Sequence, residues 1–146
     1  MMLERILVDT GPLVALASAR DEHHARCVEQ LRFIPPPLLT CWPVLTEAAW
    51  LLRAQPNSVD LLLASLRDGL LALLPMDASS AAPIASLLQK YRKLGVQLAD
   101  AALVYLAERE QIDTIFTLDR RDFGIYRTMP RSGGSRAGRR LKIVPA

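Results

Sequence analysis

The sequence contains few cysteines and few aromatic residues. Its 146 residues include two cysteines, Cys27 and Cys41, which have neither the Cys-x-x-Cys nor the Cys/His spacing of a zinc site. We therefore expect no disulfide framework and place both thiols in the core. Aromatic residues make up 5% of the chain, so it offers few platforms for stacking bases, which argues against a general single-strand nucleic-acid binder.

Long hydrophobic runs are also missing. Although 51% of the residues are hydrophobic, no apolar stretch approaches the ~18 residues that indicate a membrane span. The opening residues, Met-Met-Leu-Glu-Arg, lack the basic, apolar and small-residue regions of a signal peptide. We therefore expect no membrane association and a cytoplasmic location. A chain of this length fits one domain, residues 1–146, which buries roughly 68–70% of its unfolded surface.

Positive charge is unevenly distributed along the chain. Residues 1–126 hold 12 basic and 15 acidic residues, whereas residues 127–146 hold six basic and no acidic residues, which together give the net charge of +3. The segment from about 127 to 140 is rich in Gly, Ser and Arg and precedes a last apolar run. We interpret it as a solvated loop, of a kind that can attract phosphates.

Apolar runs alternate with stretches of helical periodicity. The predicted strands span residues 3–8, 38–41, 70–76, 114–118 and 141–144, and the predicted helices span 12–19, 21–33, 44–53, 59–68, 77 to about 91, and 98–107. The first strand shows little polar alternation, which is typical of a strand buried on both faces of a parallel sheet. The pattern predicts an α/β fold with a central parallel sheet of four to five strands flanked by helices.

Acidic residues directly follow two of these strands. Asp9 ends the first strand, and Asp119 ends the strand at 114–118. In open α/β sheets, ligands bind in the crevice outside the carboxyl ends of the strands. Each residue also has a structural alternative, because Asp9 can cap the helix that opens at Pro12 and Asp119 can cap a helical turn containing Asp122.

Two further acids lie on helices. Asp100 is the single charge in residues 98–107, which are apolar on nearly every face and therefore predicted to be buried. A helix dipole contributes ~0.3–1 kcal/mol to such an aspartate, less than the several kcal/mol that an unpaired buried carboxylate costs, so we expect a cationic or strongly hydrogen-bonding group to face it. Glu47 has Val44 rather than Ser or Thr three residues before it, which disfavours a capping box, although a solvent-exposed glutamate remains an alternative. Asp77 is explained as a helix cap and left outside the site.

If Asp9, Glu47, Asp100 and Asp119 meet at one edge, their charges must be neutralised. Two ionised carboxylates ~5 Å apart repel by on the order of 3 kcal/mol at an effective dielectric of ~20, and several such pairs would rival the ~5–15 kcal/mol stability of a domain. An all-oxygen cluster suits Mg²⁺ or Mn²⁺, and such an ion activates water and stabilises charge on a phosphodiester oxygen. We expect Asp9 and Asp100 to bind the metal most directly, while Glu47 and Asp119 complete the coordination or orient water.

Four segments resemble the PIN-domain ribonucleases, especially the VapC-like toxins of toxin–antitoxin pairs, and the resemblance extends over residues 3–145. They are Ile6-Leu7-Val8-Asp9-Thr10, Leu45-Thr46-Glu47, Leu98-Ala99-Asp100-Ala101-Ala102 and Thr117-Leu118-Asp119-Arg120-Arg121-Asp122-Phe123. The resemblance implies a PIN-like domain whose acidic centre is formed by the four carboxylates. It also implies a Mg²⁺-dependent endoribonuclease with RNA as substrate, a small antitoxin as partner, and a homodimer.

Within that centre, the resemblance suggests supporting hydrogen bonds from Thr10 and Thr117, with Thr10 as a candidate to orient the Asp9 carboxylate and Asp122 beside them. The chain departs from the family at two places. Gly11 stands where many relatives have a serine, so a hydroxyl is absent there, and the 127–140 segment is longer and more basic than usual. Basic residues near the acids and in this segment can attract an RNA backbone, and the candidates are Arg120, Arg121, Arg139 and Arg140.

Two other functions compete with a ribonuclease. A phosphatase of the haloacid-dehalogenase type would use Asp9 as covalent nucleophile, but such enzymes need Asp-x-Asp and position 11 is glycine. A non-catalytic RNA-binding or antitoxin-binding module would keep the fold and use the acids only as contacts. Preserved RNA binding without metal-dependent turnover would distinguish this module from an enzyme.

Overall fold

Five short strands form a parallel sheet in the order β3-β2-β1-β4-β5. The computed structural model describes residues 4–128 and 138–145. Its elements are β1 (Ile6–Val8), α1 (Thr10–Ala17), α2 (His24–Leu31), β2 (Leu38–Thr40), α3 (Trp42–Leu51), α4 (Pro56–Arg67), β3 (Leu71–Leu73), η1 (Ala78–Ser80), α5 (Ala81–Lys90), η2 (Arg92–Leu94), α6 (Leu98–Glu110), β4 (Thr114–Phe116), α7 (Arg120–Ile125) and β5 (Lys142–Val144). The predicted α/β fold with a parallel sheet is confirmed. In the described ranges, no helix has the length and apolar character needed to cross a membrane.

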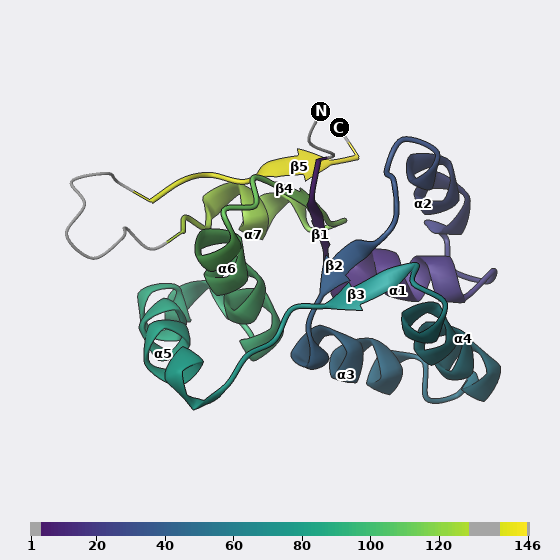
Figure 1. Cartoon of the computed structure of the whole chain (residues 1–146), viewed down its shortest axis with the longest axis horizontal. Coiled ribbons are helices and arrows are strands. Elements are labelled where there is room, and N and C mark those ends of the chain that lie inside the picture. Colours follow the sequence, from purple (N-terminus) through teal and green to yellow (C-terminus); the bar gives the residue numbers. More distant parts are fainter. Residues whose placement is uncertain (1–3, 129–137, 146) are drawn as a thin grey trace.

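The central strand β1 positions the site. Leu7 pairs with Leu39 of β2 on one side and with Ile115 of β4 on the other. The chain therefore leaves β1 toward one edge of the sheet and later returns to pair on its other side, which opens a crevice at the carboxyl ends of these strands. In Figure 1, α5 and α6 lie on one side of the sheet (left) and α1, α2 and α4 on the other (right).

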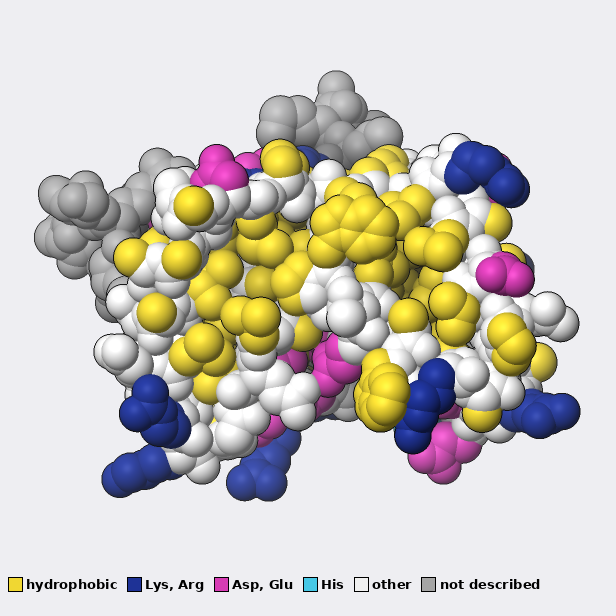
Figure 2. Space-filling view, turned by 90° about the horizontal axis from the view of Figure 1, so that it is seen from below, with side chains coloured by type: hydrophobic (Ala, Val, Ile, Leu, Met, Phe, Trp, Pro, Cys, Tyr) yellow, Lys and Arg dark blue, Asp and Glu magenta, His cyan; other side chains and the backbone are white. Residues whose placement is uncertain are grey.

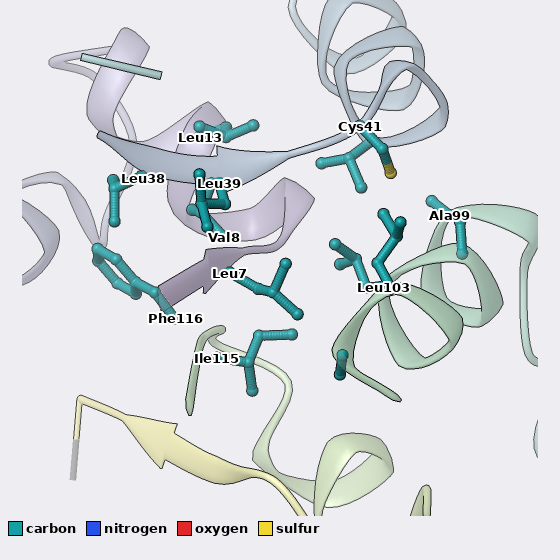
Figure 3. Close-up of a cluster of buried hydrophobic side chains, with 14 of the residues drawn as sticks. Leu7, Val8, Leu13, Leu38, Leu39, Cys41, Ala99, Leu103, Ile115 and Phe116 are labelled. Carbon is teal, nitrogen blue, oxygen red and sulfur yellow. The ribbon is translucent and has the colours of Figure 1, made fainter. Parts of the chain in front are cut away.

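The core explains why α6 is apolar around most of its circumference. Figure 3 shows Leu7 and Ile115 pointing toward Leu103 of α6, while Phe116 points away from that helix. On its other sides α6 packs against α5 and α3, so the predicted burial of residues 98–107 is confirmed for most positions. Cys27 and Cys41 are buried free thiols, as predicted.

Several element boundaries differ from the prediction. The first helix starts at Thr10, directly after the extended Asp9, and α4 starts at Pro56, because proline is well suited to a first helical turn. The third strand covers only Leu71–Leu73 and lies at an edge of the sheet. The predicted loop at 127–140 falls largely on residues 129–137, which lie outside the described residues.

Candidate active site

An open cleft of about 570 Å³ lies at the carboxyl end of the sheet. All four predicted acids line it, and they arrive from the ends of β1 and β4 and from helices α3 and α6: Asp9, Glu47, Asp100 and Asp119, with Asp122 beside them. Figure 2 looks onto this end of the molecule and shows acidic side chains in a hollow between two hydrophobic areas, with lysine or arginine side chains on either side. The topology therefore brings these acids together.

Asp9 is the most buried acid of the cleft, with 6% of its surface exposed. It occupies the N-cap position of α1, but its side chain forms no capping bond. Its Oδ2 accepts a hydrogen bond of 2.8 Å from the Thr117 hydroxyl. Its buried Oδ1 has no partner in hydrogen-bond geometry among the described residues, although the backbone of Thr10 lies close enough to lower the pKa of the carboxyl. Burial raises the pKa of Asp9 to about 7, and the charges of Asp100 and Glu47 contribute to the increase. The capping alternative therefore does not explain this side chain.

Thr117 links Asp9 to Asp119. Besides donating to Asp9, its hydroxyl accepts a 2.9 Å bond from the backbone N–H of Asp119. Asp119 in turn caps α7, because its Oδ1 accepts a 2.9 Å bond from the backbone N–H of Asp122. The capping alternative is thus correct for Asp119, and the same residue still lines the cleft. For Asp122, burial and the neighbouring Asp119 raise the pKa of the carboxyl.

The expectation that the Thr10 hydroxyl orients Asp9 is wrong, because this hydroxyl bonds to a different acid. The Thr10 hydroxyl donates a 2.7 Å hydrogen bond to Oε2 of Glu47, and this bond joins the first turn of α1 to the second turn of α3. Glu47 is half-buried at the cleft, so it is not the solvent-exposed glutamate of the alternative interpretation. The two threonines therefore hold two separate carboxylates, Thr117 holding Asp9 and Thr10 holding Glu47.

Asp100 is held by a backbone N–H group and lies near other carboxylates. Its Oδ2 accepts a 3.3 Å bond from the backbone N–H of Gln97 and closes a capping box at the start of α6. Burial raises the pKa of Asp100 to about 6, with further increases from Glu47, Asp119 and Asp122. Within residues 4–128 and 138–145, no lysine or arginine bonds to it. Of the two kinds of group predicted to face Asp100, a cation or a hydrogen-bond donor, the described residues supply a donor, the backbone N–H of Gln97 at the start of its own helix.

The four candidate arginines do not share one surface. Arg121 is exposed on α7, whereas Arg120 donates a 2.6 Å bond to the carbonyl of Pro145. Arg139 bonds to Asp113 and lies 3.5 Å from Glu108. Because β5 runs parallel to β4, the chain enters β5 at the amino end of the sheet, so Arg139 and the adjacent Arg140 do not join the cleft.

Sequence reasoning missed several residues that line the cleft, among them Leu51, Gly95, Gln97 and Leu118. A signal existed for two of them. Leu51 follows Glu47 by four residues, so it lies on the same helix face. Gln97 precedes Asp100 by three residues, a spacing that resembles a capping box. By contrast, Asp77 caps η1 as predicted, since its side chain accepts from the backbone N–H of Ser79.

The chemistry of the cleft fits a hard divalent cation held by few protein ligands. In the part of the chain that is described, no three His, Cys, Asp or Glu side chains are close enough to hold one ion together. Mg²⁺ is commonly bound by one or two carboxylates and completes its shell with water and substrate phosphates. The unpartnered Oδ1 of Asp9 and the raised pKa values of Asp9 and Asp100 mark the place where a positive charge would be most favourable.

Comparison with known proteins gives the same family as the motifs. Residues 6–128 match the family model of the PIN domain. The chain is 32% identical over 143 residues to Ribonuclease VapC26 of Mycobacterium tuberculosis (strain ATCC 25618 / H37Rv), which covers 96% of this chain and 100% of that protein. The fold is similar to that of Mycobacterium tuberculosis VapC20, described as a sarcin–ricin loop cleaving toxin, with a TM-score of 0.70, 20% identity, and coverage of 80% of this chain and 91% of that one. The chain therefore belongs to the PIN-domain family.

Proposed function

We propose that the chain is a Mg²⁺-dependent endoribonuclease, the toxin of a toxin–antitoxin pair, which hydrolyses RNA phosphodiester bonds; Mn²⁺ could replace Mg²⁺. The 32% identity to a VapC ribonuclease supports the reaction class. The observation that carries the proposal is the cluster of carboxylates at one cleft, with an unpartnered buried oxygen on Asp9. Such an arrangement costs stability and gains from a cation.

In this proposal the chain holds the ion mainly through Asp9 and Asp100, with Glu47 and Asp119 nearby. When bound, the ion supplies positive charge that polarises water and offsets charge on the phosphate. Thr117 fixes the orientation of Asp9 through its 2.8 Å bond. Thr10 occupies Oε2 of Glu47, which leaves Oε1 to accept a hydrogen bond from a water in the cleft and so to orient it.

The test is cleavage of RNA in Mg²⁺ with and without EDTA. We expect Asp9→Asn and Asp100→Asn each to reduce cleavage by ~10³-fold, because each removes charge stabilisation worth several kcal/mol. The matched control is Asp60→Asn, since Asp60 is exposed on α4 away from the cleft residues. Unchanged cleavage in both cleft variants would overturn the proposal.

A non-catalytic binding module is the second candidate. One observation favours it, namely that no three of the described side chains are close enough to hold an ion together. In such a module, cations of a bound partner would neutralise the acids. RNA binding that persists while no tested RNA is turned over in Mg²⁺ or Mn²⁺ would establish this function instead.

We further propose a small antitoxin as partner and a homodimer, with the cytoplasm, where cellular RNA lies, as the place of action. An apolar groove of about 350 Å³ supports a protein partner. It is lined by residues of α1, α2 and α4 that include Leu13, Val28 and Leu61, and the last two are about half exposed. Copurification with the product of a short adjacent reading frame tests the partner, and light scattering of the purified chain tests the dimer.

A further inference from the structure

An exposed tryptophan and an arginine form a fixed pair at the end of α3. The guanidinium carbon of Arg53 lies 4.0 Å from the centroid of the Trp50 ring. Arg53 also donates a 2.8 Å bond from Nη1 to the backbone carbonyl of Trp50. Within the described ranges Arg53 forms no ion pair with an acidic residue, so its charge is held in place without being neutralised.

This pair lies at the rim of the acidic cleft. Glu47 and Leu51 of the same helix line the cleft, and Trp50 is three residues after Glu47 and directly before Leu51. Residues three or four apart are neighbours on a helix surface, with ~5–6 Å between their Cβ atoms. Trp50 is 63% exposed even though Arg53 lies over one face of its ring, which leaves ring surface open to solvent for stacking.

Exposed pairs of this kind suit one class of ligand, a nucleotide of single-stranded RNA. Every base has a π-face that stacks on an indole, and a guanidinium binds phosphate through its planar fork of N–H groups. The acids of the cleft repel phosphates, so an RNA chain needs attractive contacts beyond them. Trp50, within one helical turn of Glu47, and Arg53, just beyond the end of α3, offer stacking and positive charge side by side.

We propose that Trp50 and Arg53 form a nucleotide-binding platform, in which a base adjacent to the scissile bond stacks on the exposed ring surface of Trp50 and a phosphate contacts Arg53. This inference rests on the proposed ribonuclease function and adds a substrate-positioning site to it. The structure also supplies a matched control. Trp42 begins the same helix and is 57% exposed, but no arginine stacks on it among the described residues.

Binding should be measured separately from cleavage. The probe is a fluorescein-labelled single-stranded RNA oligonucleotide, titrated with the full chain in EDTA at several salt concentrations. We expect Trp50→Ala to weaken binding by roughly 5- to 100-fold, Trp50→Phe to restore most of the loss, and Trp42→Ala to have little effect. Arg53→Gln should weaken binding and lower the salt dependence by about one phosphate contact. In Mg²⁺, Trp50→Ala should raise KM more than it lowers kcat.

Each result decides between the platform and an alternative. Equal RNA affinity of the parent, Trp50→Ala and Arg53→Gln proteins would overturn the platform, as would an equal loss in Trp42→Ala or no measurable binding by the parent chain. If Trp50→Ala instead halves the mass measured by light scattering, the pair is an interface between copies of the chain. Binding that follows the expected pattern without any cleavage would keep the platform and reject the nuclease, so the two failures are distinguishable.

Discussion

At the amino end of the sheet, acidic side chains pair with arginines, whereas at the carboxyl end they face one another. Glu110 accepts a 3.1 Å bond from Arg5 and a 3.0 Å bond from Arg109, and these bonds lower the pKa of its carboxyl. Arg139 bonds to Asp113 and lies beside Glu108. At the other end, burial and neighbouring acids raise the pKa of Asp9 to about 7 and that of Asp100 to about 6.

This difference shows that the fold places arginines beside acids at one end of the sheet. Arginines reach the amino end from the segments before β1 and β5, yet no basic side chain in the described ranges bonds to Asp9, Glu47 or Asp100. A cluster of acids that lowers stability, in a protein that pairs other acids with arginines, supports the proposed cation site, because a bound cation would offset the repulsion. The comparison therefore distinguishes the acids that bond to arginines from the cleft acids to which we assign the proposed function.

The largest expected effect is an opposite pH dependence at the two ends. The folded state binds a proton at Asp9 more tightly than the unfolded chain does, because the pKa rises from 3.8 to about 7. The contribution of protonated Asp9 to the free energy of unfolding is therefore fully present below about pH 4. This contribution, up to ~4 kcal/mol, is lost as pH rises through about 7. Glu110 has a lowered pKa, so its contribution is present above its usual range and is lost on acidification.

Urea unfolding in EDTA at pH 5 and pH 8 measures this effect. We expect the free energy of unfolding to be smaller at pH 8 than at pH 5, and Asp9→Asn to reduce this difference. When Mg²⁺ replaces EDTA, it should stabilise the protein more at pH 8 than at pH 5, because protons and cations compete for the same carboxylate oxygens. Glu110→Gln is the control at the amino end, and it should leave this difference unchanged. An identical decline in the parent and Asp9→Asn proteins would contradict the assignment.

A smaller effect is expected from the threonine that holds Asp9. Thr117→Val removes the donor to Asp9 and the acceptor for the backbone N–H of Asp119, at a position that is fully buried. We expect cleavage to fall by ~10–100-fold and Thr117→Ser to restore most of it. At the amino end, Arg139→Gln should cost up to ~1 kcal/mol of stability without affecting cleavage. If Thr117→Val and Arg139→Gln slowed cleavage equally, the carboxyl end of the sheet would not be the part of the molecule on which cleavage specifically depends.

Local sequence patterns predicted most of the fold and the position of the acids. The position of an acid after a buried strand, as at Val8–Asp9, can be predicted because the direction of the strand alone places the acid at the carboxyl end of the sheet. The hydrogen-bond partners of these side chains could not be predicted in this way. Thr10 donates to Glu47 rather than to Asp9, which depends on how α1 docks on α3. Likewise, the bonds of Arg139 to acids at the amino end follow from β5 pairing parallel to β4, a long-range contact that composition does not encode.

The smallest predicted effect concerns a glycine at each end of the sheet. Gly11 lines the cleft in the first turn of α1, and a Cβ there would meet Leu118 at 3.5 Å, an ordinary contact. Gly11→Ala should therefore stabilise the protein by about 0.4–1 kcal/mol, because it restricts the unfolded chain. Gly69, just before β3, has a φ of +81°, so Gly69→Ala should destabilise the protein, and by more than that amount, because alanine rarely adopts this backbone conformation.

Gly11→Ser then isolates the effect of a hydroxyl at this position. We expect the serine and alanine variants to cleave RNA at the same rate, because Thr10 and Thr117 already hold Glu47 and Asp9 through short hydrogen bonds. Cleavage rates under saturating Mg²⁺, with unfolding free energies measured alongside, test this expectation. A serine variant that is several-fold faster than the alanine variant would show that the carboxyl end lacks a hydroxyl that its chemistry can use.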